Sequence, residues 1–198
     1  FQCDWSSDVC SSDLSDLPPA RVGLVRASAT ALPFSGQADL VFSTATFHWI
    51  ADHDALFRSV ARALRPGGWL VAQCGGGPNL ARIHGRGDAL MSDTRFAPFF
   101  ADWVEPWNLA AAADTIARLE RAGFVDIDVT VDPSPVTLST PDGFAEFIAT
   151  VVCREHLLKL PDPVRQRQFI DALTALASGD DPPLTLDYWR LNMRARRR

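Results

Sequence analysis

The sequence predicts an α/β fold built on an open sheet, and three consecutive segments carry that prediction. Residues 39–43, Asp-Leu-Val-Phe-Ser, form a short apolar run typical of a strand covered on both faces. Residues 55–65 repeat apolar side chains at helical spacing, and residues 69–73, Trp-Leu-Val-Ala-Gln, form a second apolar run. Strand, helix and strand make a βαβ unit, whose strands are parallel and whose crossover is right-handed.

The helix of this unit has recognisable start and stop signals. Asp52 or Asp54 can cap its first turn. Residues 66–68, Pro-Gly-Gly, end it, because proline cannot continue a helix and glycine accepts a left-handed turn. Its apolar positions are Leu56, Phe57, Val60 and Leu64.

The segments before this unit are short. Residues 1–14 repeat Ser-Ser-Asp without helical or strand periodicity, and we interpret them as a non-native or disordered tail. Residues 21–25, Arg-Val-Gly-Leu-Val, follow two prolines and predict a strand. The remaining chain, residues 15–198, is expected to form one domain.

The segments after the unit alternate between helices and strands. A helix is expected at 79–91, an irregular aromatic stretch at 95–109, a helix at 114–122, a half-buried strand at 124–131, helices at 141–152 and from 163, and an extended run at 184–196. The last run can pair antiparallel with residues 124–131 as a C-terminal hairpin.

Composition excludes several classes of protein. A chain of 198 residues with 47% hydrophobic content is expected to form one core. Its formal charge of −5 argues against a nucleic-acid-binding surface. Four irregularly spaced cysteines indicate neither a disulfide framework nor a metal site, and no membrane span or signal peptide is visible. We expect a cytoplasmic monomer without nucleic-acid or membrane partners.

Several short motifs, taken in order, resemble a known family. They are Leu-Pro-Phe at 32–34, Ala-Asp-Leu-Val-Phe-Ser at 38–43, His-Trp at 48–49 and Leu-Arg-Pro-Gly-Gly at 64–68. This series is similar to class I S-adenosylmethionine-dependent methyltransferases, in the small-molecule branch that includes trans-aconitate and ubiquinone/menaquinone-type methyltransferases. The resemblance is strong over 22–74 and weaker through Val131.

The resemblance implies a fold, a cofactor and a reaction. The fold is a Rossmann-like class I sheet with helices on both faces and a C-terminal antiparallel hairpin. Residues 21–25 correspond to the family's third strand, so its first two strands and their glycine-rich loop are missing and 15–198 reads as a partial domain. The cofactor is S-adenosyl-L-methionine, and the reaction is methyl transfer to a small-molecule acceptor. A carboxylate acceptor is favoured because Phe-His-Trp-Ile at 47–50 resembles the trans-aconitate side of the branch.

Two groups of residues correspond to the cofactor site in the resembled family. Ser28 and Ala29 stand where the family usually has Asp-Ala beside adenine; serine can accept a hydrogen bond but supplies no charge. The end of the central strand should border the methionine and ribose portion, because short side chains let a ligand approach the backbone. The residues concerned are Ser43, Thr44, Ala45, Thr46 and His48.

His48 is also the candidate catalytic residue. Its neutral imidazole could accept a proton from a hydroxyl acceptor, or it could only line the pocket. A carboxylate acceptor needs no base, since methyl transfer depends mainly on proximity and alignment. The resemblance places Trp49, Trp103 and Trp107 around the substrate, although aromatic stripes more often serve packing.

The other polar residues give weaker indications. His53, His84 and His156 lack the spacing of metal ligands, and no metal site is expected. Four arginines could bind an acidic substrate, and the sequence does not choose among them: Arg82, Arg86, Arg95 and Arg154.

Two alternatives remain open. The chain could be a non-catalytic remnant that binds no cofactor. It could also be a Rossmann-type nucleotide-binding oxidoreductase, but the Gly-x-Gly-x-x-Gly fingerprint of that class is nowhere in the sequence.

Overall fold

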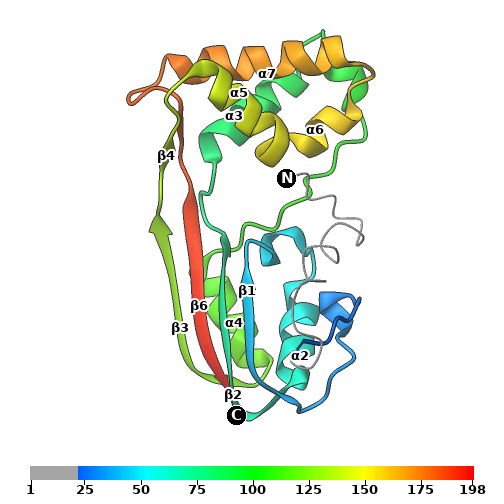
Figure 1. Ribbon diagram of the computed structural model, residues 1–198, viewed down its shortest axis with the longest axis vertical. Coiled ribbons are helices and arrows are strands. Elements are labelled where there is room, and N and C mark those ends of the chain that lie inside the picture. The colour runs from blue at the N-terminus through cyan, green and yellow to red at the C-terminus, as the bar shows by residue number, and fades with distance from the viewer. Residues whose placement is uncertain (1–21) are drawn as a thin grey trace.

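The computed structural model describes residues 22–198, so the predicted tail at 1–14 lies outside the described residues. A sheet forms the lower part of the molecule in Figure 1 and a layer of helices lies across its upper end. No helix among the described residues is long and apolar enough to cross a membrane. The elements are η1 (Ala29–Ala31), β1 (Ala38–Thr44), η2 (Phe47–Trp49), α2 (His53–Ala63), β2 (Leu64–Gly75), α3 (Ala81–Met91), η3 (Ala97–Phe99), α4 (Ala112–Arg121), β3 (Phe124–Pro133), β4 (Val136–Thr137), α5 (Pro141–Phe147), η4 (Ile148–Val152), α6 (Arg154–Lys159), α7 (Pro163–Ser178), β5 (Thr185–Leu186) and β6 (Trp189–Arg197).

The main sheet has the strand order β1-β2-β6-β3. β1 and β2 are parallel, which confirms the predicted βαβ unit. β6 runs antiparallel between β2 and β3, with Met193 opposite both Ala72 and Val129, which confirms the C-terminal hairpin. The sheet is therefore mixed, and the carboxyl ends of β1 and β2 lie at the same edge, where ligands of open α/β sheets bind.

Helix α2 begins at its predicted cap and ends just before the predicted stop signal. The Asp52 carboxylate accepts a hydrogen bond from the backbone N–H of Ala55, as predicted for the cap. The helix ends at Ala63, three residues before the proline, and Leu64 already begins β2. The Pro-Gly-Gly segment thus lies at the start of β2, where Gly67 has a φ of +79° that favours glycine.

The resemblance predicts helices on both faces of the sheet. Among the described residues, helices cover one face only. Helices α2 and α4 pack on the same side, where their Phe57 and Leu119 share a core with Leu70, Leu191 and other inward residues of β2 and β6. On the opposite side Leu40 and Phe42 of β1 are 53% and 69% exposed. The physical reason is that, within residues 22–198, the core of the sheet is formed with α2 and α4 alone, which pack against the same face.

The strand predicted at residues 21–25 is wrong for the residues that the structure describes. Residues 22–28 have no regular secondary structure, and Leu24 and Val25 are more than half exposed. A strand needs a neighbour for its backbone hydrogen bonds, and β1, which ends the sheet, does not pair with this segment.

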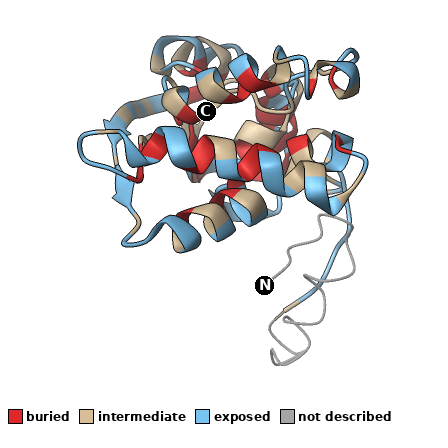
Figure 2. Ribbon diagram, turned by 90° about the horizontal axis from the view of Figure 1, so that it is seen from above, coloured by how far each residue is buried: buried red, intermediate tan, exposed pale blue. Residues whose placement is uncertain are grey.

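A second core holds the helical layer, which we call the cap: residues 79–103 and 138–186. Its buried centre includes Phe96, Phe144, Phe169 and Leu173, contributed by segments from both halves of the cap. Seen from above in Figure 2, the cap helices are buried on one side and exposed on the other. The helix expected at 141–152 is present as α5 followed by the π-helical turn η4.

Candidate functional site

The end of β1 forms a sharp connection to η2. Ala45 has a left-handed φ of 54°, and its N–H donates to the carbonyl of Gln73 in β2 at 2.8 Å. The Thr46 hydroxyl donates to the carbonyl of Thr44, whose own side chain is exposed. Ser43, Thr44, Ala45, Thr46 and His48 therefore lie together at the carboxyl edge of the sheet, as the sequence predicts.

Ser28 and Ala29 lie apart from this connection, at the start of η1 against α2. The Ser28 hydroxyl is exposed and caps η1: it accepts from the Thr30 N–H at 3.3 Å and bonds the Thr30 hydroxyl at 2.8 Å. Ala29 packs against the sheet core. The adenine-binding role of these two residues stays a prediction, and Ser28 would have to exchange its local bonds for a ligand.

His48 is fixed across the edge of the sheet by a backbone donor. The N–H of Gly75 in β2 donates to His48 Nδ1 at 3.3 Å. Because Nδ1 accepts, the neutral ring carries its proton on Nε2. Burial, the charge of Arg190 and the charge of His53 together lower the pKa of His48 to about 4. At neutral pH His48 is thus an uncharged hydrogen-bond donor through Nε2.

Arg190 is a site residue that the sequence analysis missed. It stands opposite Gly75 in the β2–β6 pairing, and its guanidinium stacks on Tyr188 at 4.3 Å from the ring centre. Among the ion pairs between described residues, none involves Arg190. Only the antiparallel return of the last strand brings this cation beside His48, so no local motif could have revealed it.

The three predicted pocket tryptophans gather between the sheet edge and the cap. Trp49 is 5.3 Å from the His48 ring and 5.7 Å from Trp107. Trp107 stacks on His84 at 4.9 Å, and Trp103 stacks on His156 at 4.5 Å. The structure brings these tryptophans near one another, and their role with substrate stays a prediction.

The spacing of His84 and His156 in the sequence does not predict a metal site. The structure brings them to the same aromatic group from α3 and α6, and each has its pKa lowered, chiefly by burial, that of His156 to about 4. Within the described chain, no group of three or more His, Cys, Asp or Glu could hold a metal ion. Both imidazoles are therefore neutral members of an aromatic cluster at neutral pH.

The loop that carries Trp103 and Trp107 is tied to the site by Asn108. Its backbone N–H donates to the His48 carbonyl at 2.7 Å, and its side-chain amide donates to the Ala51 carbonyl at 2.9 Å. His53 fixes the same turn from α2, through a 2.9 Å bond between Nε2 and the Phe47 carbonyl. These bonds hold the aromatic loop over the end of β1.

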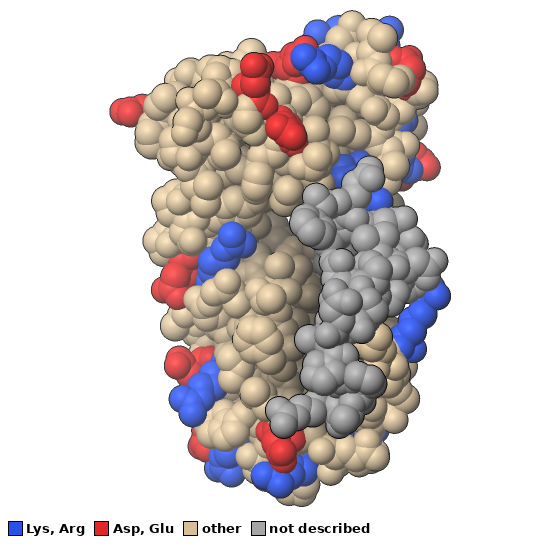
Figure 3. All heavy atoms as spheres, viewed as in Figure 1, with Lys and Arg blue, Asp and Glu red and all other residues tan. Residues whose placement is uncertain are grey.

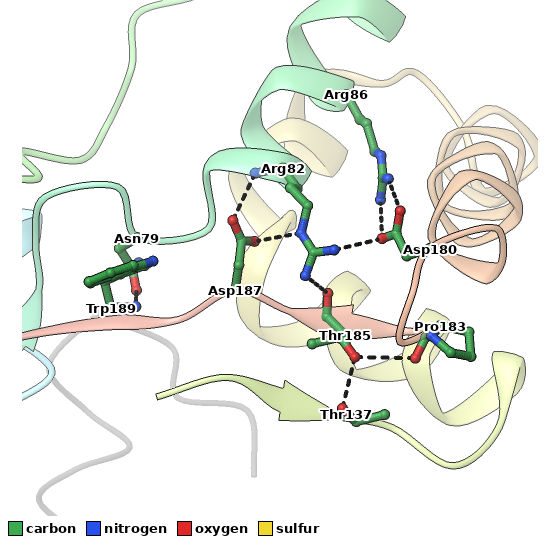
Figure 4. A network of polar contacts seen from close by, with 9 residues as sticks. All are labelled: Asn79, Arg82, Arg86, Thr137, Asp180, Pro183, Thr185, Asp187 and Trp189. Carbon is green, nitrogen blue, oxygen red and sulfur yellow. Dashed lines mark hydrogen bonds and ion pairs between the residues drawn. The ribbon is translucent and has the colours of Figure 1, made fainter. Parts of the chain in front are cut away.

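Arg82, Arg86 and Arg95, three of the arginines considered for an acidic substrate, are already engaged. Arg86 forms a bidentate pair with Asp180, and Arg82 bridges Asp180, Asp187 and the Thr185 carbonyl, which fastens α3 to the segment after α7 (Figure 4). Arg95 pairs with its neighbour Asp93 at the surface. Charges of both signs are interspersed over the face in Figure 3.

Comparisons with known proteins bear on this geometry. The methyltransferase domain family Methyltransf_11 matches residues 2–72. An uncharacterized methyltransferase of Schizosaccharomyces pombe is 31% identical over 90 residues, 43% of this chain and 35% of that protein. The mitochondrial arginine-hydroxylase NDUFAF5 of Danio rerio is 30% identical over 132 residues, 64% of this chain and 39% of that protein. The structure of a putative methyltransferase from Bacillus halodurans matches with a TM-score of 0.55 at 15% identity, covering 89% of this chain and 78% of that one.

The chain has a class I methyltransferase fold. The resemblance drawn from the motifs is confirmed at this level, while the trans-aconitate branch remains a prediction. The chain spans less than two fifths of the length of these two curated relatives. One of them is named a hydroxylase, so kinship within this fold does not by itself fix the reaction.

Proposed function

We propose that this chain carries out S-adenosylmethionine-dependent methyl transfer to a small-molecule acceptor, at the carboxyl edge of β1 and β2. The observation that carries the proposal is the linkage of His48 to Gly75, which joins the two strand ends under the aromatic loop of the class I fold. We further propose a cytoplasmic protein that works as a monomer.

The residues at the end of β1 fit part of the cofactor. Ser43 and Ala45 have short side chains, and Ala45 and Thr44 are exposed, so a ligand can reach the backbone there. The exposed Ser28 hydroxyl and the backbone of Ala29 would meet the adenine. When bound, S-adenosylmethionine would supply a methyl group on a sulfonium. The neutral thioether is a good leaving group, so in-line displacement of the methyl group needs no metal.

The acceptor side is formed by groups that bind and orient. His48 Nε2–H can donate to an acceptor oxygen, and its low pKa keeps it neutral at pH 7. The Arg190 charge close by favours an anionic group. We therefore propose a carboxylate as the methyl-accepting group, because it is already ionised at neutral pH and does not require His48 to take a proton.

Chemical-shift mapping tests this assignment. The ¹⁵N-labelled chain is titrated with S-adenosylhomocysteine up to several millimolar. The proposal predicts shifts concentrated at Ser43–Thr46, His48 and Gly75. Shifts confined to other parts of the chain, or no shifts at the highest concentration, would overturn the proposed site.

A further inference from the structure

A group of side chains that methyl transfer itself does not require lies where the cap meets the aromatic loop. We call it the cap cluster: His84, Asp88, Trp103, Glu105, Trp107 and His156. Two of its indole rings are held by stacking, Trp107 on His84 with an interplanar angle of 11° and Trp103 on His156 with an angle of 27°. Indole faces carry negative electrostatic potential and attract cations within about 6 Å.

Two carboxylates accompany these rings. Asp88 follows His84 by one helical turn on α3. Burial lowers the pKa of His84, and the charge of Asp88 only partly offsets that lowering, while the same charge adds to the raised pKa of Glu105. Desolvation is the larger cause of the raised pKa of Glu105, and its carboxylate approaches the Trp103 indole. The ion pairs between described residues include neither Asp88 nor Glu105. Within residues 22–198, no ion pair therefore neutralises the carboxylates of Asp88 and Glu105.

The nearby arginines do not supply that cation. Arg82 and Arg86, on the same helix as Asp88, are held by Asp180 and Asp187. His84 and His156 have lowered pKa values and stay neutral at neutral pH. The balance of charge in the cap cluster is therefore negative.

Two polar atoms inside the cap cluster also lack partners. His156 is only 4% exposed, and its Nδ1 has no hydrogen-bond partner in the structure. The buried Nε1 of Trp103 has no partner at strict hydrogen-bonding geometry, although the Glu105 carboxylate lies close enough to this N–H for the contact to lower its own pKa. Buried polar groups left without partners cost roughly 1–3 kcal/mol each, so such groups are usually satisfied in the working state of a protein. A bound molecule with both a donor and an acceptor would satisfy them.

We propose that the cap cluster binds an organic cation, an ammonium-type group carried by the acceptor apart from its methyl-accepting end. The proposal rests on the proposed function only in identifying the ligand as the acceptor. The indole faces and the carboxylates of Asp88 and Glu105 attract the positive charge, and His156 Nδ1 pairs with a polar group of the ligand. The contact of Trp107 with Trp49, which adjoins His48, makes the subsite continuous with the sheet edge.

Binding of choline and of its uncharged isostere 3,3-dimethylbutan-1-ol tests the proposal. Both are titrated into the chain at pH 8 without cofactor, and the Trp103 indole ¹⁵N–¹H signal and the His156 ring signals are followed. Choline is expected to shift both sets of signals and to bind about tenfold more tightly than the isostere. Glu105→Gln should weaken choline binding several-fold, whereas Glu146→Gln, an exposed acid on α5, should leave it unchanged.

Three results would overturn the proposal. Equal affinity for choline and the isostere would show an apolar site without charge selectivity. Absence of shifts at Trp103 and His156 would show that the cap cluster serves packing alone. An equal loss in Glu105→Gln and Glu146→Gln would show a non-local charge effect. Because no cofactor is present, none of these outcomes depends on the S-adenosylhomocysteine experiment.

Discussion

At the scale of single residues, protonation and hydrogen bonding decide what His48 can do. Its Nδ1 already accepts a hydrogen bond from the Gly75 N–H, and its Nε2 already carries the proton of the neutral ring. Neither nitrogen is therefore free to accept a proton from an acceptor. Its pKa of about 4 also makes it a weak base at neutral pH. The sequence left base and pocket lining as alternatives, and the geometry favours pocket lining.

Replacing His48 with asparagine, in a form of the protein that binds the cofactor and has measurable turnover, tests this assignment. The Asn Oδ1 can accept from Gly75 as Nδ1 does, so turnover with a carboxylate acceptor should fall less than about tenfold, with cofactor affinity unchanged. A general base would instead cost roughly 10²–10⁴-fold and remove the lower-pH limb of the rate profile. A hundredfold loss of turnover at unchanged cofactor affinity would therefore restore His48 as the base and indicate a hydroxyl acceptor.

Buried His156 should make stability depend on pH. Its folded-state pKa is about 4, below the ordinary 6.5, so the unfolded chain binds a proton that the folded chain excludes. Stability should therefore fall as the pH is lowered from about 6.5 to about 4, by up to roughly 3 kcal/mol for this group. Urea unfolding of the parent and of His156→Phe at pH 7.5 and 4.5 measures this, and the variant should lose less stability on acidification. An identical loss in both proteins would refute the role of His156.

At the scale of elements, the cap is positioned by ion pairs that no sequence pattern indicates. Asp180 follows α7, and Asp187 lies between β5 and β6, yet both meet α3 (Figure 4). The hydrogen bonds from Arg86 lower the pKa of Asp180. This arrangement fixes the helix that carries His84 relative to the last strand, and thus to Arg190.

Two matched substitutions compare the Arg86–Asp180 ion pair, which we call the brace, with an ordinary surface ion pair. Arg86 and Asp180 have side chains only 22% and 12% exposed, so Arg86→Gln leaves a largely buried carboxylate and should cost about 2 kcal/mol. Arg95 and Asp93 are more exposed, and Arg95→Gln should cost less than about 1 kcal/mol. Unfolding free energies from urea titration measure both, and equal costs would contradict the structural role of the brace.

At the scale of the whole molecule, local patterns predicted the parts but not their assembly. Strand and helix periodicity and the Asp52 cap were sufficient for the βαβ unit and the terminal hairpin. The strand at 21–25 failed because an apolar run becomes a strand only where a neighbour can pair with it. Arg190 was missed, and the stacking of His84 and His156 on the tryptophans was not predicted, because long-range packing places these residues and single-sequence spacing carries no such information.

We propose that the described residues form the acceptor side of a class I methyltransferase site and only one corner of its cofactor side. The cofactor contacts in such a fold are shared among several strand ends, and β1 and β2 are the parallel strands that residues 22–198 supply. The exposed Leu40 and Phe42 show how open the sheet is beside that corner. Cofactor affinity therefore measures how much of the site this chain holds.

Calorimetric titration of the 198-residue chain with S-adenosylmethionine is the most direct measurement. We expect weak binding, with a dissociation constant near or above about 1 mM, which corresponds to a binding free energy of about 4 kcal/mol or less. A dissociation constant in the low micromolar range, about 8 kcal/mol, would contradict it and show that the chain contains a complete cofactor site.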